Sequence, residues 1–397
     1  MSASTAVLNR IQYSYLGLVQ FLFLLTWVVY VIFLGDLVEK LGLPKDFVPR
    51  LLLIDQLLFV CADLALALYA DRLMRLLRSL APVLISLNLL SCLAFVALPH
   101  LATGAPAVFI GATIVWVLTA SVLRAPLYGL IARRGGEPGR AMAGALLGMG
   151  LASAFAPYLG VILKGVDPVL PFTIAGVGLA LATLGFFSWE ARQLPAKSID
   201  CSLKPAWGVI SRLALMVLLL GLAFQLHFFV NAAPLYKTVA DAAWLPWLMP
   251  VFWVAFSLIV YPGALAVTRY GARRIFALSA ILGALASAAC LSEPSLPVLL
   301  VLQLLAGAAW GGIFIAALNL AGSAGNSGRE SLFIGALFAS LALAAATRIG
   351  LSLADISLTP QLTLPLAAGL WLAGAFLSLS WLKTPSLPQS IDQGEIR

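Results

Sequence analysis

Apolar runs of about 20 residues recur along the whole chain, and they restrict its fold more than any other feature of the sequence. A helix of that length crosses the hydrocarbon core of a bilayer, which is roughly 30 Å thick. Of the 397 residues, 62% are hydrophobic and only 10% are charged, far too few charges to cover a water-facing surface. The alternating segments of about ten residues that form a membrane β-barrel are absent. The chain is therefore expected to be an all-α integral membrane protein.

Charged residues and clusters of Pro and Gly divide the sequence into twelve apolar segments. The sequence therefore predicts twelve transmembrane helices, which we number as spans one to twelve. Their expected ranges are 13–35, 50–70, 80–99, 106–131, 141–163, 168–189, 213–234, 244–267, 275–292, 295–321, 331–352 and 362–382.

Basic residues are distributed unevenly between the two sides of the membrane. Most of the 24 Lys and Arg residues lie on the side of the N-terminus, and Arg124 and Arg348 lie inside spans. The connections on the opposite side hold only Lys40, Lys45, Arg50, Lys164 and Lys237. Because cytoplasmic loops carry the excess of Lys and Arg, both termini are expected in the cytoplasm. The same rule accounts for the net charge of +8 without a nucleic-acid partner.

Two short patterns occur once in each half of the chain. ADRLMRLL (70–77) follows span two and AVTRYGARRIF (266–276) follows span eight, while PGRAMAGALLG (138–148) precedes span five and SGRESLFIGALF (327–338) precedes span eleven. Such a repeat predicts two pseudo-symmetric six-helix bundles of like topology. The longest connection separates them, so the expected units are an N-terminal bundle, a cytoplasmic linker and a C-terminal bundle with a short polar tail, at 1–190, 191–212 and 213–397.

The first pair of patterns resembles a turn of the major facilitator superfamily. That family places Gly-x-x-x-Asp-Arg-x-Gly-Arg-Lys between helices two and three, and a weaker copy between helices eight and nine. The first copy here keeps Asp71 and Arg72, and the second keeps Gly271 with the basic pair Arg273 and Arg274. The chain is similar to this family over essentially its full length. The resemblance implies two six-helix bundles of the major facilitator type.

The charges of the two turns suit a cytoplasmic gate, and the candidate gating residues are Asp71, Arg72, Arg75, Arg269 and Arg273. An aspartate at a helix end can cap the N-terminus of a facing helix, and arginines can bind carbonyls or carboxylates. The alternative is that these charges only anchor the turn at anionic lipid headgroups.

Span five carries a second resemblance to the family. Its antiporters have Gly-x-x-x-Gly-Pro-x-x-Gly there, and this chain has Ala152-Ser-Ala-Phe-Ala156-Pro157-Tyr-Leu-Gly160, with alanines at the two leading glycines. Ala156, Pro157 and Gly160 are thus candidates for an antiporter motif. Small residues at every fourth position also allow close helix packing, which is the alternative interpretation.

Four ionisable residues lie within the predicted spans, namely Asp55, Asp63, Arg124 and Arg348. Each is a functional candidate, because burying an ionisable group in the bilayer costs at least a few kcal/mol. Asp63 and Arg124 lie at matched depth on spans two and four, which run in the same direction, so they can pair. We expect the pair to take part in proton coupling, with Asp63 as the proton carrier. A purely structural ion pair is the alternative.

Asp55 and Arg348 lie near the outer ends of spans two and eleven, which are neighbours across the two halves in the family. A salt bridge between them would close an outer gate in the inward-open state. Snorkelling of their charged groups toward the interface is the alternative.

Polar and aromatic residues recur at helical spacing on spans that line the cavity in the family. A polar side chain facing lipid is costly, which favours the cavity over simple packing. The expected substrate-cavity residues are Gln20, Phe23, Trp27 and Tyr30 on span one, Gln225, His227 and Asn231 on span seven, and Gln303 and Asn319 on span ten.

Together these features predict a secondary active transporter that moves a small molecule by alternating access. Proton-driven efflux, or antiport, of a small amphipathic compound is the expected mode. The first alternative is proton-coupled uptake, or symport, of a small metabolite or metal chelate, and a more remote one is a membrane sensor on a transporter scaffold. The expected partners are the substrate, protons and the lipid bilayer of a bacterial-type inner membrane, with the chain acting as a monomer.

Enzymatic chemistry is not expected. The chain has only two histidines, His100 and His227, and its four cysteines show no spacing typical of a metal site. It has no Gly-x-x-x-x-Gly-Lys-Ser/Thr loop, so ATP is not expected to drive it directly. We therefore predict neither a cofactor nor a bound metal.

Overall fold

The computed structural model describes residues 3–76, 81–132, 138–190, 207–325, 329–356 and 358–380, with residues 3–10, 73–76 and 188–190 described by their backbone alone. Throughout these ranges the regular structure is helical. They contain twelve helical spans that are long and apolar enough to cross a membrane. The predicted all-α class and the number of spans are thereby confirmed. The ninth span ends at Ser292, and the tenth begins at Leu296.

The first six spans are formed by seven α-helices, because span four is interrupted. A short 3₁₀ turn, η1 (Ser121–Leu123), separates α4 from α5 within that span. The helices are α1 (Ala3–Lys40), α2 (Phe47–Leu76), α3 (Ala81–Leu101), α4 (Pro106–Ala120), α5 (Ala125–Ala132), α6 (Pro138–Ile162) and α7 (Val169–Glu190).

Spans seven and eight are also irregular. Span seven consists of α8 (Trp207–Phe224), the π-helix η2 (Gln225–Ala232) and α9 (Ala233–Val239), and span eight of η3 (Ala242–Trp244), α10 (Leu245–Leu248) and α11 (Pro250–Tyr270). The remaining elements are α12 (Ala272–Ala289) with the turn η4 (Cys290–Ser292), α13 (Leu296–Ala324), α14 (Glu330–Leu353) and α15 (Pro360–Ser380).

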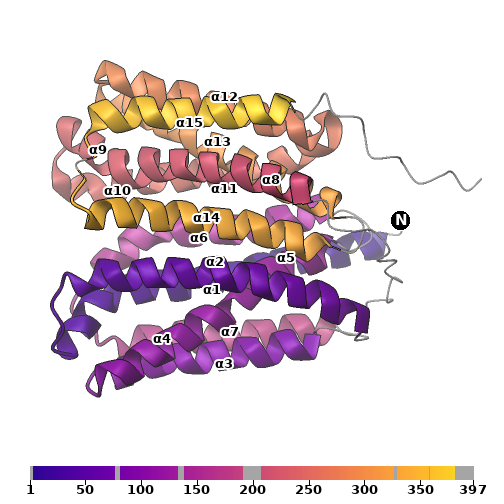
Figure 1. Cartoon of the computed structure of the whole chain (residues 1–397), viewed down its shortest axis with the longest axis vertical. Coiled ribbons are helices and arrows are strands. Elements are labelled where there is room, and N and C mark those ends of the chain that lie inside the picture. Colours follow the sequence, from indigo (N-terminus) through magenta and orange to yellow (C-terminus); the bar gives the residue numbers. More distant parts are fainter. Residues whose placement is uncertain are drawn as a thin grey trace, which may run out of the picture.

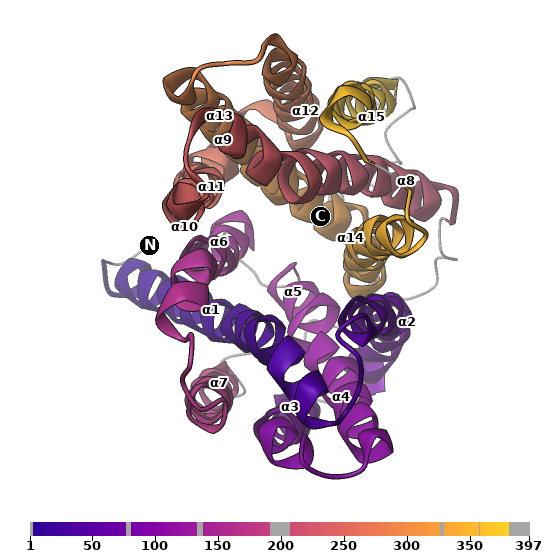
Figure 2. The same cartoon turned by 90° about the vertical axis from the view of Figure 1, so that its left-hand side faces the viewer.

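The helices run side by side along one direction, and α1 begins and α15 ends at the same end of the bundle (Figure 1). We call this the inner end, because the basic residues predict that it faces the cytoplasm, and the opposite end the outer end. Helices α1 to α7 form one group and α8 to α15 another (Figure 2). The two groups meet where α2 packs against α14 and α6 packs against α11. Residues 191–206 of the predicted linker lie outside the described ranges, so its boundaries stay a prediction.

Small residues allow α1 and α6 to approach closely within the first group. A Cβ on Gly144 would lie 2.6 Å from the carbonyl oxygen of Tyr13, and a Cβ on Gly148 would overlap the carbonyl of Gly17. Only glycine therefore fits at these two positions. By contrast, a Cβ on Gly160 would meet no atom within 4 Å. The packing interpretation of the span-five repeat thus holds at its inner part, and an antiporter role for Ala156, Pro157 and Gly160 stays a prediction.

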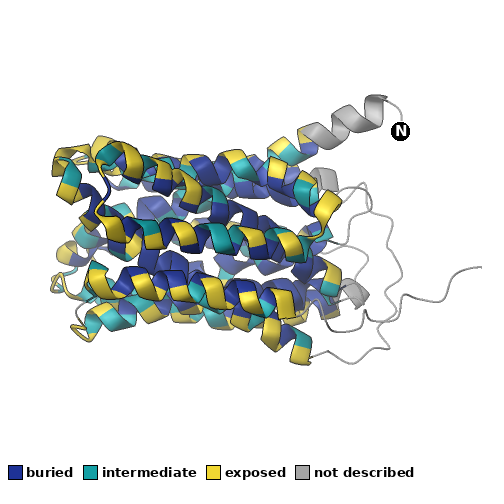
Figure 3. Cartoon of the chain, turned by 90° about the horizontal axis from the view of Figure 1, so that it is seen from above, coloured by how far each residue is buried: buried dark blue, intermediate teal, exposed yellow. Residues whose placement is uncertain are grey.

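The outward faces of the helices are apolar. Exposed positions follow the outside of the bundle in Figure 3, and large hydrophobic side chains such as Leu93, Leu258 and Phe376 are 69%, 71% and 72% exposed. Soluble proteins rarely expose extended apolar surface of this kind. Lipid is the solvent that such a surface fits, since the backbone polar groups are satisfied inside each helix. The chain is a multi-pass membrane protein.

Candidate functional site

The site is built around a break in span four. Arg124 lies between η1 and α5 with φ −104° and ψ −105°, which is outside the helical region. The side-chain amide of Gln20 on α1 donates a hydrogen bond to the freed carbonyl oxygen of Leu123 at 2.9 Å. Pro126, the second residue of α5, has no N–H to continue the ladder across the break. Irregular backbone at membrane depth is tolerated where protein groups satisfy it, as Gln20 does here.

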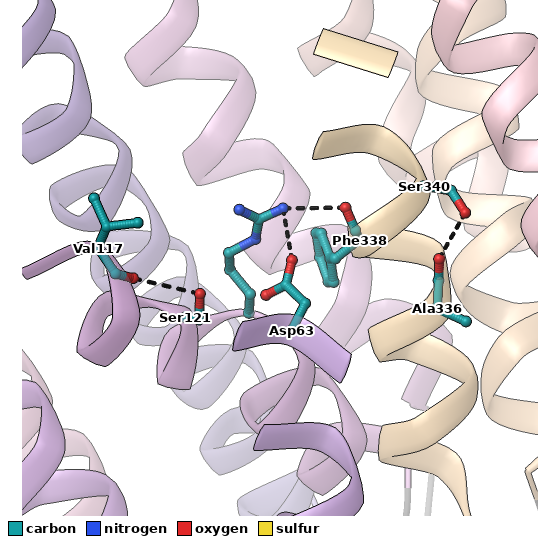
Figure 4. A network of polar contacts seen from close by, with 7 residues as sticks. Asp63, Val117, Ser121, Ala336, Phe338 and Ser340 are labelled. Atoms are coloured by element: carbon teal, nitrogen blue, oxygen red, sulfur yellow. Dashed lines mark hydrogen bonds and ion pairs between the residues drawn. The ribbon is translucent and has the colours of Figure 1, made fainter. Parts of the chain in front are cut away.

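Arg124 forms an ion pair with Asp63 of α2. The Nη2 atom of Arg124 lies 3.0 Å from Oδ2 of Asp63, and the same atom donates to the carbonyl oxygen of Phe338 at 3.3 Å. Figure 4 shows both contacts as dashed lines from one nitrogen, to the Asp63 carboxylate and to the Phe338 carbonyl. Phe338 belongs to α14, so the arginine joins α2, span four and the second half of the chain. The structure thus brings together the two residues that the sequence matched by depth.

The two charges of this pair differ in their access to open space. Asp63 is fully buried, whereas the side chain of Arg124 is 14% exposed. The guanidinium carbon lies 4.5 Å from the ring centre of Phe59 and 5.2 Å from that of Phe338. Such ring faces stabilise a cation that has lost much of its water. Arg124 is therefore the member of the pair that an incoming molecule would meet.

Arg124 lines a cavity of about 210 Å³ between the two halves. Gln20, Phe23 and Trp27 on α1 line it as well, as the sequence predicts. The sequence analysis did not single out most of the other lining residues. Those that bring polar or aromatic groups are Thr26, Gln56, Phe59, Trp116, Tyr128, Phe314 and Phe338.

Tyr30 and Gln225, by contrast, do not line this cavity in the structure, so their substrate contact stays a prediction. The Tyr30 hydroxyl is buried and donates a hydrogen bond to Oδ2 of Asp55 at 2.9 Å. Gln225 accepts a hydrogen bond on Oε1 from Nε of Arg348 at 2.8 Å. Each side chain thus forms a hydrogen bond with a buried or half-buried ionisable residue, a contact that helical spacing alone does not reveal.

His227, Asn231 and Gln303 were also expected in the cavity, and the structure instead buries all three within the second group of helices. Nδ1 of His227 lies 2.9 Å from the Ser287 hydroxyl oxygen, and Thr363 donates to Oδ1 of Asn231 at 2.7 Å. For His227 and Asn231 the physical reason lies in the π-helix η2, because its wider turns change how the residues of span seven are distributed around the helix.

Asn319 is the last predicted cavity residue that the structure places elsewhere. Its side-chain amide donates to the carbonyl oxygen of Ile315, one turn earlier on α13, at 2.7 Å. Its Oδ1 would lie 3.2 Å from a Cβ on Gly139 of α6. Asn319 thus packs at the contact between the halves near the inner end rather than in the cavity.

Among the predicted gating residues, Asp71 makes a contact that crosses between the halves. It is buried, and its two carboxylate oxygens accept hydrogen bonds from the backbone amides of Ser331 and Leu332 at 3.2 and 2.9 Å. These amides belong to the first turn of α14, where the N–H groups lack helical partners and the helix dipole favours an anion. The capping contact predicted for Asp71 is therefore present.

The arginines of the two turns lie differently. Arg72 and Arg269 are exposed and Arg273 is half-buried, while the side chain of Arg75 lies outside the described residues. The Arg269 guanidinium lies 5.2 Å from the ring centre of its neighbour Tyr270. Exposed arginines at the inner end fit an anchor at lipid headgroups as well as a gate, so their gating role stays a prediction.

Asp55 and Arg348 are not paired in this structure. Asp55 is bound by Tyr30, while Arg348 donates to Gln225 and lies 5.0 Å from the ring centre of Phe229. Their salt bridge was expected in the inward-open state. Here Asp71 of the first half caps α14 of the second half at the inner end. Their pairing therefore remains a prediction about a different state.

Comparisons with known proteins place this geometry in a known fold. No family model and no curated protein match the chain by sequence. Among solved structures, the chain is similar to that of the human organic anion transporter MFSD10 (TETRAN), with a TM-score of 0.73. The match covers 95% of this chain and 100% of that one at 16% sequence identity, a level that shows the fold alone. With its twelve membrane-length helices, the chain has the fold of the major facilitator superfamily.

Proposed function

We propose that this chain is a proton-coupled secondary transporter that moves a small molecule by alternating access, in a bacterial-type inner membrane and as a monomer. The observation that carries the proposal is the Asp63–Arg124 ion pair beside a cavity between the two halves. In carriers built from two repeats, the substrate binds near the midplane between the halves. An ionisable pair at that depth costs stability, and a functional role accounts for it.

The contacts at the inner end support the alternating part of the proposal. Asp71 holds the start of α14 against α2, and a Cβ on Gly335 of α14 would lie 2.5 Å from the Cβ of Ala67. Packed interfaces of this kind have discrete closed and open arrangements rather than a continuous range. Loss of the Asp71 contacts would let the halves separate at the inner end and open the cavity there.

The ion pair also supports proton coupling. With Asp63 ionised, the pair is neutral overall, and with Asp63 protonated it carries one positive charge. Linkage requires that a substrate which favours one of these states changes proton binding by the same factor. A cationic substrate favours the ionised pair and leads to antiport, in line with the antiporter motif that span five resembles. An anionic substrate favours the protonated state and leads to symport.

The first experiment is a search for a ligand by thermal stability. Drugs, sugars, organic acids and metal chelates are added to the purified protein at pH 6 and pH 8. A ligand at a hundred times its Kd stabilises the folded state by about 2.7 kcal/mol, which shifts the melting curve measurably. A compound that stabilises the protein is then used in proteoliposomes that contain a pH-sensitive dye.

The carrier function is tested with Asp63→Asn, and Asp46→Asn serves as the control because Asp46 is exposed at the outer end. We expect the compound to move protons across the membrane with the parent protein and the control, and Asp63→Asn to abolish the proton movement. Full pH-driven transport by Asp63→Asn would show that Asp63 is not the proton carrier. Correct folding of each variant is checked by size-exclusion chromatography.

A further inference from the structure

The charge and shape of the cavity specify the substrate more closely. We propose that the cavity binds a small aromatic monoanion, with the anionic group on the guanidinium of Arg124 and the ring between the aromatic side chains. The inference rests on the proposed transport function and names the substrate class of the same site.

The first argument is the charge of the cavity wall. Arg124 is the charged residue that lines the cavity, and the neutral polar groups come from Gln20, Thr26 and Gln56. Asp63, the counter-charge, is fully buried and is not part of the lining. A bound molecule therefore meets a positive group directly, while the compensating carboxylate lies behind it. A cation placed in this cavity would be repelled by Arg124.

The second argument is the number of hydrogen-bond donors that remain on Arg124. Its contacts with Asp63 and with the Phe338 carbonyl both use Nη2. Within the described residues, Nε and Nη1 donate no hydrogen bond. The planar guanidinium presents its donors in a fork that matches a carboxylate or sulfonate. A site with unused donors beside open space is arranged for an acceptor that the protein itself does not supply.

The third argument is size and shape. A cavity of about 210 Å³ is smaller than the roughly 300–1,000 Å³ of pockets for drug-sized ligands. Its walls include Trp27, which lies 5.6 Å from Phe59 and 6.1 Å from Trp116 between ring centres. Aromatic rings pack favourably at such separations. The cavity thus suits one aromatic ring that carries one anionic group.

Anion binding and proton binding are then mutually favourable. An anion on Arg124 competes with the Asp63 carboxylate for the same positive charge, and protonation of Asp63 removes that competition. The charged groups on the neighbouring helices have partners of their own: Asp55 with Tyr30, Asp71 with the amides of α14, Arg348 with Gln225, and the buried Glu330 at the start of α14. The Tyr128 phenol in the cavity wall is uncharged. By linkage, the anion binds more tightly at low pH and travels together with a proton.

The test uses salicylate as the probe, with benzamide and benzylamine as neutral and cationic counterparts of similar size. Binding to the purified protein is measured by calorimetry at pH 6 and pH 8, where salicylate stays ionised. We expect salicylate to bind at least tenfold more tightly at pH 6 than at pH 8, and neither counterpart to bind measurably.

The variants assign the binding to the pair. Arg124→Gln is expected to abolish salicylate binding, and the double variant Asp63→Asn/Arg124→Gln, which leaves no unpaired buried charge, should do the same. Asp63→Asn leaves Arg124 without its competitor, so it is expected to bind salicylate tightly at both pH values. Arg212→Gln, which removes an exposed arginine of α8, is expected to match the parent protein.

Several outcomes would overturn the anion site. Salicylate binding that survives in the folded double variant would contradict it, as would binding of benzylamine or benzamide as tight as that of salicylate. Failure of all three probes to bind the parent protein would also contradict the anion site. Proton-coupled transport of a neutral or cationic compound, lost in Asp63→Asn, would keep the carrier and reject the substrate class. Conversely, salicylate binding that requires Arg124 but moves no protons would support the anion site and reject the coupling.

Discussion

The carboxylate of Asp71 accepts a hydrogen bond from the backbone amide of Leu332 at 2.9 Å, although the two residues are 261 positions apart in the chain. A second bond from the amide of Ser331 completes the contact. One side chain on α2 thereby caps the first turn of α14, where the helix has N–H groups without partners of its own. The two halves of the molecule are thereby joined at the inner end by a helix cap that one half supplies to the other.

Removal of this cap is predicted to open the inner end. Replacement of a capping side chain by alanine costs about 1–2 kcal/mol, which corresponds to a roughly 5- to 30-fold larger open population for Asp71→Ala. Met142→Cys, in a background without the native cysteines, reports on opening, because Met142 is buried beside Gly322 of α13. Its labelling by a maleimide should accelerate by that factor. Asp46→Asn serves as the exposed control, and an unchanged rate in Asp71→Ala would show that the cap does not hold the gate.

Gly335→Ala is predicted to prevent closure of the same end. The added Cβ would lie 2.5 Å from the Cβ of Ala67 and 2.7 Å from the carbonyl oxygen of Asp63, so α14 and α2 would have to move apart. We expect transport to fall at least tenfold while Met142→Cys becomes more reactive. Gly369→Ala is the matched control, since a Cβ there meets no atom within 4 Å. If Gly335→Ala transports at the parent rate, close contact of α2 and α14 is not part of the cycle.

Asp55 and Arg348 are predicted to exchange partners when the outer end closes. In this structure each is bound within its own half, Asp55 by Tyr30 and Arg348 by Gln225. Asp55→Cys/Arg348→Cys should therefore crosslink poorly in the parent and more efficiently when Asp71→Ala favours the inward-open state. The residue pair Tyr158 and Trp247, whose rings already meet across the halves at 5.0 Å, gives a reference for the reach of the crosslinker. Crosslinking that is the same with and without Asp71→Ala would argue against an outer gate at these residues.

Gln20→Leu is predicted to destabilise the break in span four. The substitution leaves the carbonyl oxygen of Leu123 buried without its donor, at a cost of about 1–3 kcal/mol. Thermal unfolding in detergent, without ligand, measures the effect. Gln56→Leu is the control, because Gln56 lines the same cavity without a hydrogen bond to the described residues. Equal melting temperatures for the two variants would mean that the Gln20 bond does not support the break.

The sequence predicted those features that depend on length, depth and charge. Twelve apolar runs predict twelve spans, and the rise per residue of a helix places Asp63 beside Arg124 because both helices start from the same side. Asp71 was predictable in the same way, since an acid at the end of a span has few places to bind except a facing helix end.

Features that depend on local departures from the α-helix were not predictable in this way. The π-helix in span seven changes the face on which His227 and Asn231 lie, and no residue in η2 signals it by type. Trp116 and Phe338 line the cavity, yet an aromatic residue in an apolar span looks the same whether it faces lipid, core or substrate. The cavity lining depends on the tilt of each helix, and the hydrophobic periodicity of the sequence does not reveal that tilt.

The position of Trp27 and Trp116 has a practical consequence. Both indole rings belong to the cavity wall and lie 6.1 Å apart, so a molecule that enters changes the polarity around both at once. The protein thus contains its own optical probe of occupancy, readable as a change in ultraviolet emission without any attached dye. Because the chain has ten tryptophans, comparison with Trp27→Phe isolates the part of the signal that comes from Trp27.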